Sequence, residues 1–285
     1  MIIVIGKSGQ LAKELKESMS GNDIIFLGRN DINLFNEKDI FSTLKKFNPT
    51  KIINASAYTA VDKAETDIDS AFALNYKAVE YLATFCEQNK VKLIHISTDF
   101  VFDGNNSKPY KTTDTPNPIN IYGKSKLAGE HAIQAVMSDN FSIIRTSWLY
   151  SSYGNNFVKT MIKLMNNLDE INVVSDQIGS PTHAKTLVEL ITTILYSNNT
   201  SHIYNCSDLG MISWYDFALQ ILNFGIKFGI IKKQVKLNKI KSDDFYTAAK
   251  RPKYSVLEVN TSTNKLWSEN LEMFFEDSRN KKFNF

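Results

Sequence analysis

Short apolar runs alternate with amphipathic segments through the first half of the chain, and this alternation constrains the fold more than any other feature. The apolar runs lie at residues 2–5, 24–27, 51–56, 92–97 and 141–147. The segments with helical periodicity between them lie at 10–19, 37–47 and 70–89, with another that begins near residue 120. Strands alternating with helices predict parallel βαβ units, and nearly continuous apolar strands predict a sheet covered on both faces. We therefore predict an α/β fold built on a doubly wound parallel sheet.

The second half of the chain is less regular and reads as a smaller lobe. Helical patterns occupy residues 154–168, 184–197 and 213–225, and Ser213 is placed to cap the last of them. We expect residues 1–150 to form the sheet domain. Residues 151–285 should form mostly a C-terminal lobe, with some segments returning to the sheet domain. This lobe should lie over the carboxyl ends of the strands, where such sheets bind ligands.

Charge and cysteine content exclude several classes of function. The net charge is only +3 and the lysines are scattered, which gives no support for a nucleic-acid partner. The two cysteines, Cys86 and Cys206, are too far apart in sequence for a disulfide framework or a metal-binding spacing. The opening "MIIVIG" lacks the basic region of a signal peptide, and no stretch approaches the roughly 18 apolar residues of a membrane span. We expect a cytoplasmic protein with no membrane partner.

A glycine-containing turn, "IGKSGQLA" at residues 5–12, joins the first strand to the first helix. Gly6 and Gly9 permit a tight turn and a close backbone approach, and the helix N-terminus offers N–H groups to a pyrophosphate. The full dinucleotide pattern has three glycines, and Ala12 fills a later small position here. A simple strand–helix turn is the alternative. The position of the turn, at the first βα unit, favours a dinucleotide site in a Rossmann-type sheet.

The end of the second strand, "FLGRNDI", bears on the choice of cofactor. A carboxylate at this position usually holds the free 2′-hydroxyl of NAD, whereas Arg29 lies here. A guanidinium suits a 2′-phosphate, which favours NADPH; an ordinary surface arginine is the alternative. Asp31 lies two residues further on and can contact a ribose or adenine, so NADH stays open.

The run "NIYGKSKLAGEHA" at residues 120–132 places a tyrosine four residues before a lysine. If a helix begins near Asn120, Tyr122 and Lys126 share one face of it. An ammonium near a phenol lowers the tyrosine pKa from about 10, and such a tyrosine can transfer a proton near neutral pH. A solvated pair is the alternative. Glu130 and Gln134 fall outside the apolar stripe of this helix.

The run "HISTDFVFDG" at residues 95–104 follows the strand at 92–97. Ser97, Thr98 and Asp99 lie at its carboxyl end, where such sheets place their chemistry. A hydroxyl there can hold a carbonyl beside a proton donor, and a carboxylate can bind a sugar hydroxyl. We interpret His95 as a hydrogen-bonded core residue. A phosphate-binding turn, a strand-end hydroxyl and a tyrosine–lysine pair together predict a nicotinamide-dependent carbonyl reductase.

The chain resembles the extended short-chain dehydrogenase/reductase superfamily and, within it, the dTDP-4-dehydrorhamnose reductase family. The resemblance covers nearly the whole length, on the motifs "GKSGQLA", "NASAYTAVDKAE", "STDFVFDG", "YGKSKLAGE", "RTSWLY", "GNNFVKTM", "DQIGSPT" and "RPKYSVL". It implies reduction of the C4 keto group of dTDP-4-dehydro-L-rhamnose to dTDP-L-rhamnose by NADPH or NADH. The substrate is then a small nucleotide sugar.

The resemblance also implies residue roles. Tyr122 would protonate the C4 carbonyl oxygen, Thr98 would hydrogen-bond the same oxygen, and Lys126 would lower the tyrosine pKa and hold the nicotinamide ribose. The remaining cofactor contacts would come from the first glycine turn, the second strand end and two further strand ends: Gly6, Lys7, Ser8, Gly9, Gln10, Leu11, Arg29, Asp31, Ile32, Ala55, Ser56, Ala57, Thr59 and Ser97. The substrate contacts would be Thr98, Asp99, Phe100, Trp148, Asn156 and Arg251. Arg251 is the candidate for the diphosphate, because arginine pairs well with phosphate oxygens. Trp148 has core packing as its alternative.

Two other functions stay open at this stage. A sister 4-ketoreductase would make another deoxysugar, since product stereochemistry depends on which face of the ketone meets the hydride. A nucleotide-binding regulatory subunit of the methionine adenosyltransferase type would not need turnover, and the presence of Thr98, Tyr122 and Lys126 argues against it. The family resemblance also implies a homodimer. Some members hold Mg²⁺ at a dimer contact, but no carboxylate cluster in this sequence requires a metal, so we predict no metal site.

Overall fold

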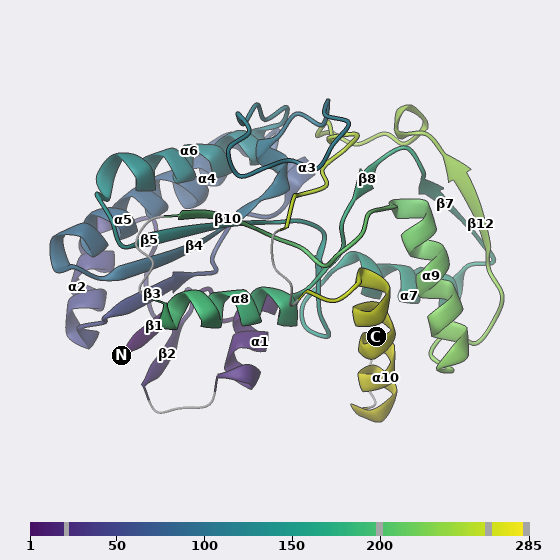
Figure 1. The fold of residues 1–285 in the computed structure, drawn as a ribbon, viewed down its shortest axis with the longest axis horizontal. Helices are drawn as coiled ribbons and strands as arrows, with labels where there is room; N and C mark the ends of the chain where they lie inside the picture. The colour runs from purple at the N-terminus through teal and green to yellow at the C-terminus, as the bar shows by residue number, and fades with distance from the viewer. Residues whose placement is uncertain (20–22, 198–201, 260–263, 282–285) are drawn as a thin grey trace.

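A parallel six-stranded sheet organises the N-terminal part of the molecule (Figure 1). The computed structural model describes residues 1–19, 23–197, 202–259 and 264–281. The strands run in the order β10–β5–β4–β3–β1–β2, and every adjacent pair is parallel. Their bounds are β1 Ile2–Ile5, β2 Ile24–Leu27, β3 Lys51–Asn54, β4 Lys92–Thr98, β5 Phe141–Thr146 and β10 His202–Cys206. The predicted α/β fold with a doubly wound parallel sheet is confirmed.

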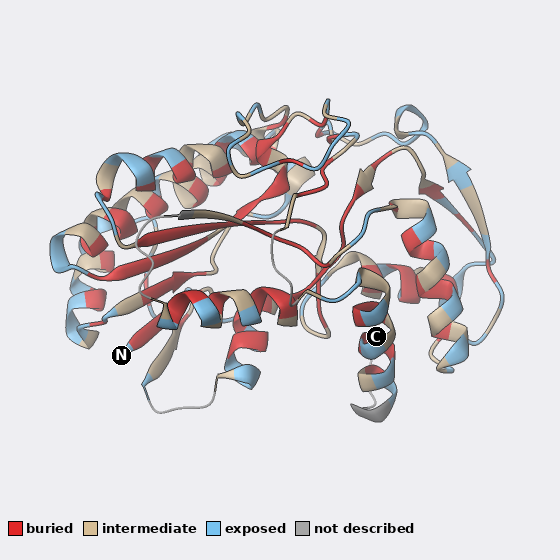
Figure 2. Ribbon diagram, in the orientation of Figure 1, coloured by how far each residue is buried: buried red, intermediate tan, exposed pale blue. Residues whose placement is uncertain are grey.

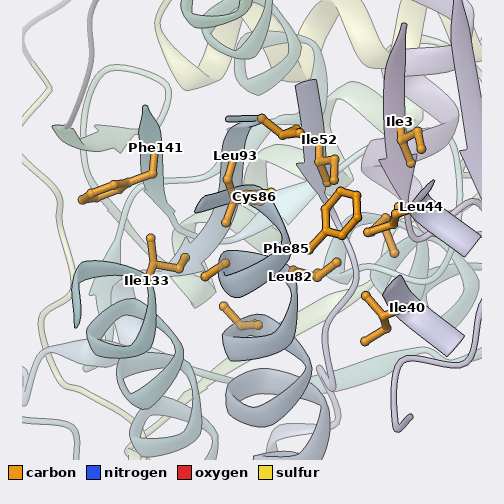
Figure 3. Close-up of a cluster of buried hydrophobic side chains, with 14 of the residues drawn as sticks. Ile3, Ile40, Leu44, Ile52, Leu82, Phe85, Cys86, Leu93, Ile133 and Phe141 are labelled. Atoms are coloured by element: carbon orange, nitrogen blue, oxygen red, sulfur yellow. The ribbon is translucent and has the colours of Figure 1, made fainter. Parts of the chain in front are cut away.

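Helices cover both faces of this sheet (Figure 1). One face packs against α2 (Glu37–Phe47), α5 (Ala78–Asn89) and α6 (Ile121–Val136), and the other against α1 (Gln10–Ser18) and α8 (Ala184–Tyr196). Strand β1 shows why its sequence is apolar throughout. Ile3 packs with the cluster that includes α2, α5 and α6 (Figure 3), Val4 packs with the cluster that includes α1 and α8, and both are fully buried. The strands of the main sheet are largely buried (Figure 2). Successive side chains point to opposite faces, so a strand between two helical layers needs an apolar residue at every position.

The segment predicted as one helix at 70–89 is not α-helical throughout its first half. It starts as α4 (Ile68–Phe72), continues as a π-helical turn, η1 (Ala73–Lys77), and then becomes α5. Asn75 lies in the π turn, accepts a hydrogen bond from the Tyr58 backbone N–H at 2.8 Å and donates to Ser125 Oγ of α6 at 3.0 Å. The turn therefore ties the loop after β3 to α6, and π turns of this kind occur often at functional sites.

A second lobe packs beside the sheet and has its own core. Its helices are α7 (Phe157–Asn167), α9 (Trp214–Lys227) and α10 (Trp267–Lys281). Its strands are short and associate two by two, as β6 with β9, β7 with β12 and β8 with β11. Their bounds are β6 Leu149–Tyr150, β7 Glu170–Val174, β8 Ile178–Gly179, β9 Thr182–His183, β11 Ile212–Ser213 and β12 Lys236–Ile240. Ser213 caps α9 as predicted, because its side chain accepts a hydrogen bond from the Asp216 backbone N–H.

The chain returns to the sheet after residue 150, through α8 and β10. Strand β10 was not recognised in the sequence, because "HIYNC" mixes polar and apolar residues; it forms a sheet edge, where only one neighbour, β5, pairs with it. The boundary near residue 150 stays a prediction. No helix among the described residues is both long and apolar enough to cross a lipid bilayer.

Candidate active site

A cavity of about 550 Å³ lies at the carboxyl ends of β1, β3, β4 and β5. Its wall is formed by four separate chain segments that the sequence analysis singled out. Residues at and after the end of β5 complete the wall. Its lining residues are Ser8, Gly9, Gln10, Leu11, Ala55, Ser56, Ala57, Thr59, Val61, Ile96, Ser97, Thr98, Asp99, Phe100, Tyr122, Lys126, Thr146, Ser147, Trp148, Leu149, Gly154, Asn155 and Trp214. The predicted residues therefore come together from the glycine turn, two strand ends and one helix.

The glycine turn offers backbone N–H groups to this cavity. Gly6 has φ +108°, and a Cβ on it would lie 2.8 Å from the carbonyl carbon and oxygen of Ala55. Only glycine allows the first turn to approach β3 so closely. Gly9 forms the N-cap of α1, and no side chain of the described residues caps this helix end. An uncapped helix N-terminus in a cavity wall fits the diphosphate of a dinucleotide.

The start of α6 places Tyr122 beside the end of β4. Asn120 caps the helix by accepting a hydrogen bond from the Gly123 N–H at 2.7 Å. A Cβ on Gly123 would lie 2.1 Å from the Phe100 carbonyl oxygen, so a larger residue would push the helix away from the turn after β4. The rings of Tyr122 and Phe100 meet edge to face at 5.7 Å. Thr98, Tyr122 and Lys126 consequently line one cavity.

The pKa values in this site differ from the prediction. Burial raises the pKa of Tyr122 to about 12, although a hydrogen bond with Thr98 acts in the opposite direction. Burial lowers the pKa of Lys126 to about 8, against the opposing effect of Glu130. The predicted lowering of the tyrosine pKa by Lys126 is therefore wrong for this structure. The lysine Nζ instead donates to the Ile96 carbonyl at 2.6 Å and lies 3.2 Å from His95 Nε2.

A buried ion pair behind the cavity was not anticipated. Glu130 and Arg145 have side chains only 1% and 2% exposed, and they are joined at 2.7 Å between Oε2 and Nη2, with Nε also donating to the carboxylate. Ser97 Oγ donates to Glu130 Oε1 at 2.5 Å. The position of Glu130 outside the apolar stripe does not make it solvent-exposed. The signal in the sequence was Arg145, a charged residue inside the apolar run "FSIIRTS".

A second cavity of about 400 Å³ shares Phe100, Trp148 and Trp214 with the first. Its other lining residues are Phe157, Thr160, Met161, Leu164, Ile171, Asn172, Val173, Val174, Gln177, Ser242, Phe245, Thr247, Arg251, Pro252 and Ser255. Trp148 stacks on Trp214 with ring centroids 3.4 Å apart, so it both packs and lines a cavity. Arg251 donates to both carboxylate oxygens of Asp62 at 3.1 and 2.6 Å.

Asp99 is the buried carboxylate of the first cavity. Burial raises its pKa to about 6, and Thr98 Oγ1 donates to its Oδ1 at 3.0 Å. Its other oxygen, Oδ2, has no hydrogen bond of ordinary geometry among the described residues, although the Ser255 side chain acts to lower the pKa of this carboxyl. Because Asp99 lines the cavity, its carboxylate is a candidate acceptor for a ligand hydroxyl.

Several predicted residues lie outside both cavities. Arg29 is exposed, and Asp31 accepts hydrogen bonds from Gly28 N at 2.8 Å and Lys7 Nζ at 3.5 Å. Ile32 is 3% exposed and its side chain belongs to the hydrophobic core, and its contact with adenosine stays a prediction. Gly6 and Lys7 shape the glycine turn without lining the cavity.

Asn156 has a structural role at the start of α7. It accepts a hydrogen bond from the Lys159 N–H at 3.0 Å, which caps the helix, and it donates to the Ser151 carbonyl at 2.7 Å. It lines neither cavity, and its contact with substrate stays a prediction. His95 is a hydrogen-bonded core residue, as interpreted from the sequence. No group of three or more His, Cys, Asp or Glu residues among the described side chains is arranged to hold a metal ion.

Comparison with known proteins identifies the family. The family described as the RmlD substrate binding domain matches residues 1–279. The dTDP-4-dehydrorhamnose reductases of Sinorhizobium fredii and Aggregatibacter actinomycetemcomitans are 40% and 37% identical over 266 residues, covering 91% and 90% of this chain and 89% and 90% of those proteins. The solved structure of the dTDP-4-dehydrorhamnose reductase of Bacillus anthracis, in complex with NADP, has a TM-score of 0.91 at 36% identity, covering 97% of this chain and 98% of that one. The chain therefore belongs to the RmlD substrate binding domain family and is an NAD(P)-dependent oxidoreductase of the dTDP-4-dehydrorhamnose reductase type.

Proposed function

We propose that this enzyme reduces the C4 keto group of dTDP-4-dehydro-L-rhamnose and so forms dTDP-L-rhamnose. The observation that carries this proposal is the convergence of Thr98, Tyr122 and Lys126 in one cavity that shares a wall with a second, largely apolar cavity. The bound nicotinamide cofactor supplies the hydride to C4. The relatives named for this reaction, at 37–40% identity, support the same assignment.

Tyr122 acts as the general acid in this proposal. Because burial raises its pKa to about 12, the phenol stays protonated at neutral pH and carries the proton that the carbonyl oxygen takes up. Thr98 Oγ1, whose proton points at Asp99 Oδ1 in this structure, turns it to that oxygen as a second hydrogen bond and keeps the oxygen near the phenol. Asp99 accepts a hydrogen bond from a sugar hydroxyl through Oδ2, which fixes the ring for attack.

The glycine turn holds the cofactor diphosphate at the N-terminus of α1, and Lys126 holds the nicotinamide ribose. Arg29 is the exposed cation at the end of β2, and we propose that it pairs with the 2′-phosphate and makes NADPH the preferred cofactor. Asp31 is already engaged with Gly28 and Lys7, which leaves less of its carboxylate for the ribose of NADH.

The second lobe provides the substrate site, and most of the described residues after 150, apart from α8 and β10, belong to this lobe. The aromatic walls of the second cavity suit a nucleobase, and Arg251 suits the diphosphate between base and sugar. The sugar then extends past Trp148 towards Tyr122. That the enzyme forms a homodimer stays a prediction, which a measurement of its mass in solution would test.

The test is an assay with purified enzyme, NADPH or NADH, and dTDP-4-dehydro-L-rhamnose, with the product sugar identified by NMR. The expected product is dTDP-L-rhamnose. Tyr122→Phe should lower kcat by roughly 10²–10⁴-fold, the usual effect of losing a general acid, and leave cofactor binding in place. Tyr76→Phe, a change on η1 outside both cavities, serves as the control and should retain wild-type turnover.

Near-normal turnover by Tyr122→Phe would contradict the assigned acid. Turnover that yields a different deoxysugar would keep the chemistry and make the chain a sister 4-ketoreductase. Cofactor binding without turnover of any nucleotide-sugar ketone would favour a regulatory binding protein.

A further inference from the structure

A buried hydrogen-bonded chain connects the cavity wall to the catalytic lysine. Ser56 donates its backbone N–H to Asn54 Oδ1 at 3.1 Å, and its hydroxyl donates to the same oxygen at 2.6 Å. Asn54 Nδ2 lies 3.1 Å from His95 Nδ1, and His95 Nε2 lies 3.2 Å from Lys126 Nζ. Asn54, His95 and Lys126 are each 1% exposed or less.

This series of hydrogen bonds fixes the orientation of the Asn54 amide. A backbone N–H can only donate, so the Asn54 atom that faces Ser56 must be the acceptor oxygen. The atom that faces His95 is then the amide nitrogen, which can only donate. His95 Nδ1 must therefore accept, and in a neutral imidazole the single ring proton lies on Nε2.

His95 stays neutral in these surroundings. Burial, and secondarily the charge of Lys126, hold its pKa well below 6.5. Its Nε2–H consequently points at the lysine nitrogen. A neutral amine can accept this hydrogen bond while it donates to the Ile96 carbonyl at 2.6 Å, whereas an ammonium has no lone pair and would meet Nε2–H as donor against donor.

We propose that His95 is a positioning residue that stabilises the neutral amine form of Lys126. This inference rests on the proposed function, in which Tyr122 loses a proton to the product in each cycle. Lys126 is the only cation in the described wall of the first cavity, so it is the group that can return a proton to the phenolate. The proton leaves Nζ for the tyrosine oxygen, the lysine becomes a neutral amine, and His95 holds it in that form until it takes up a proton again from water.

The other titratable groups around Lys126 act differently. Glu130, on the same helix, favours the ammonium, but its carboxylate is paired with Arg145 of β5. Tyr122 on α6 and Asp99 after β4 also line the cavity. Of these groups, only His95 directs a hydrogen-bond donor at the lysine nitrogen in the geometry of this site.

The first test reads the tautomer directly. Long-range ¹H–¹⁵N NMR of the wild-type protein, labelled at histidine, distinguishes a ring protonated at Nε2 from one protonated at Nδ1. His95→Asn identifies the His95 signals by their loss. We expect a neutral ring with its proton on Nε2; a proton on Nδ1 would overturn the proposal. This result does not depend on which sugar the enzyme reduces, so it separates failure of this inference from failure of the proposed function.

The second test is the pH dependence of kcat. Activity should fall as pH rises through the pKa of Lys126, because the lysine then lacks the proton that Tyr122 needs. Asparagine at position 95 keeps an acceptor for Asn54 but is too short to reach Lys126, so His95→Asn should move this fall to higher pH by about one unit, the size of one hydrogen bond. His95→Gln, whose amide nitrogen reaches the place of Nε2, should restore the wild-type profile. The positioning role of His95 would be contradicted if kcat of the folded His95→Asn variant fell at the same pH as that of the wild type. It would also be contradicted if the pH of the fall shifted equally in His95→Asn and His95→Gln.

Discussion

Single side chains in this enzyme take their chemistry from burial more than from their neighbours in sequence. Tyr122 and Lys126 are spaced for one helix face, yet burial raises the pKa of the phenol to about 12 and lowers that of the amine to about 8. Burial disfavours the charged form of each group, and the charged form is the phenolate for tyrosine and the ammonium for lysine. At neutral pH the phenol therefore stays protonated and the lysine stays mostly ammonium, although burial brings the pKa of the lysine within reach of neutral pH.

Arg29 is the residue that we propose sets the choice between NADPH and NADH. It is exposed at the end of β2, so Arg29→Ala should leave the fold unchanged and remove one cation facing the 2′-phosphate. We expect kcat/KM for NADPH to fall about tenfold, equivalent to roughly 1.4 kcal/mol, with little change for NADH. Steady-state kinetics with both cofactors measures this, and Arg279→Ala, at an exposed position on α10, is the control. An equal loss with both cofactors would show that Arg29 does not contact the 2′-phosphate.

Asp62 holds Arg251 in position across 189 residues of sequence. Its carboxylate accepts two hydrogen bonds from the guanidinium and one from the Ala249 N–H at 3.1 Å. Asp62→Asn should raise KM for the nucleotide sugar and Ki for dTDP by about tenfold, because the guanidinium loses its fixed direction, with a smaller effect on kcat. Asp277→Asn breaks a comparably exposed pair with Lys185 and is the control. A KM unchanged by Asp62→Asn would exclude this role.

At the scale of elements, local sequence signals set where several of the helices begin. Asn36 and Asn120 both form N-caps, accepting hydrogen bonds from Asp39 N at 3.1 Å and Gly123 N at 2.7 Å. Asparagine is among the best N-cap residues because its side chain satisfies an N–H of the first turn. Asn120 also donates to the Lys250 carbonyl at 2.8 Å, so it joins the start of α6 to the segment that contains Arg251.

These two caps form a matched pair of substitutions. Asn36→Ala and Asn120→Ala should each lower the free energy of unfolding by about 1 kcal/mol, as measured by urea denaturation. Only Asn120→Ala should also lower kcat/KM, because the first turn of α6 carries Tyr122. Equal activity in the two variants would mean that the cap of α6 does not position the tyrosine.

At the scale of the whole molecule, the contact between the lobes contains buried groups whose titration couples to folding. His183 caps α8 by accepting a hydrogen bond from the Lys185 N–H, and burial, with a smaller effect of Lys185, lowers its pKa to about 4 from 6.5. As pH falls, His183 therefore binds a proton at a higher pH in the unfolded chain than in the folded protein. The stability that neutral His183 contributes is present above pH 6.5 and is lost as pH falls towards 4.

His183→Asn removes this titration and keeps a good N-cap residue. The difference in unfolding free energy between variant and wild type should shift in favour of the variant by up to about 1.4 kcal/mol per pH unit between pH 6.5 and 4. Asp208, whose pKa burial raises to about 6, titrates in both proteins and largely cancels in this difference. His131→Asn, at an exposed position on α6, should show no such trend. A constant difference for His183→Asn across this range would contradict the assignment.

The sequence alone determined the parts of this protein that depend on near neighbours. Alternating apolar runs predicted five of the strands in the main sheet, because strand and helix periodicities are local properties. The glycine turn and the spacing of Tyr122 and Lys126 predicted which segments meet in the cavity, because parallel strands bring their carboxyl ends to one edge of a sheet.

Only the tertiary structure decided what surrounds each of these residues. Glu130 is buried against Arg145, Arg251 pairs with Asp62, and β10 completes the sheet, through contacts between segments that lie far apart along the chain or on separate elements. The pKa of Tyr122 rises instead of falling for the same reason. Burial and pairing depend on which distant segments pack together, and the local pattern of a sequence does not specify that packing.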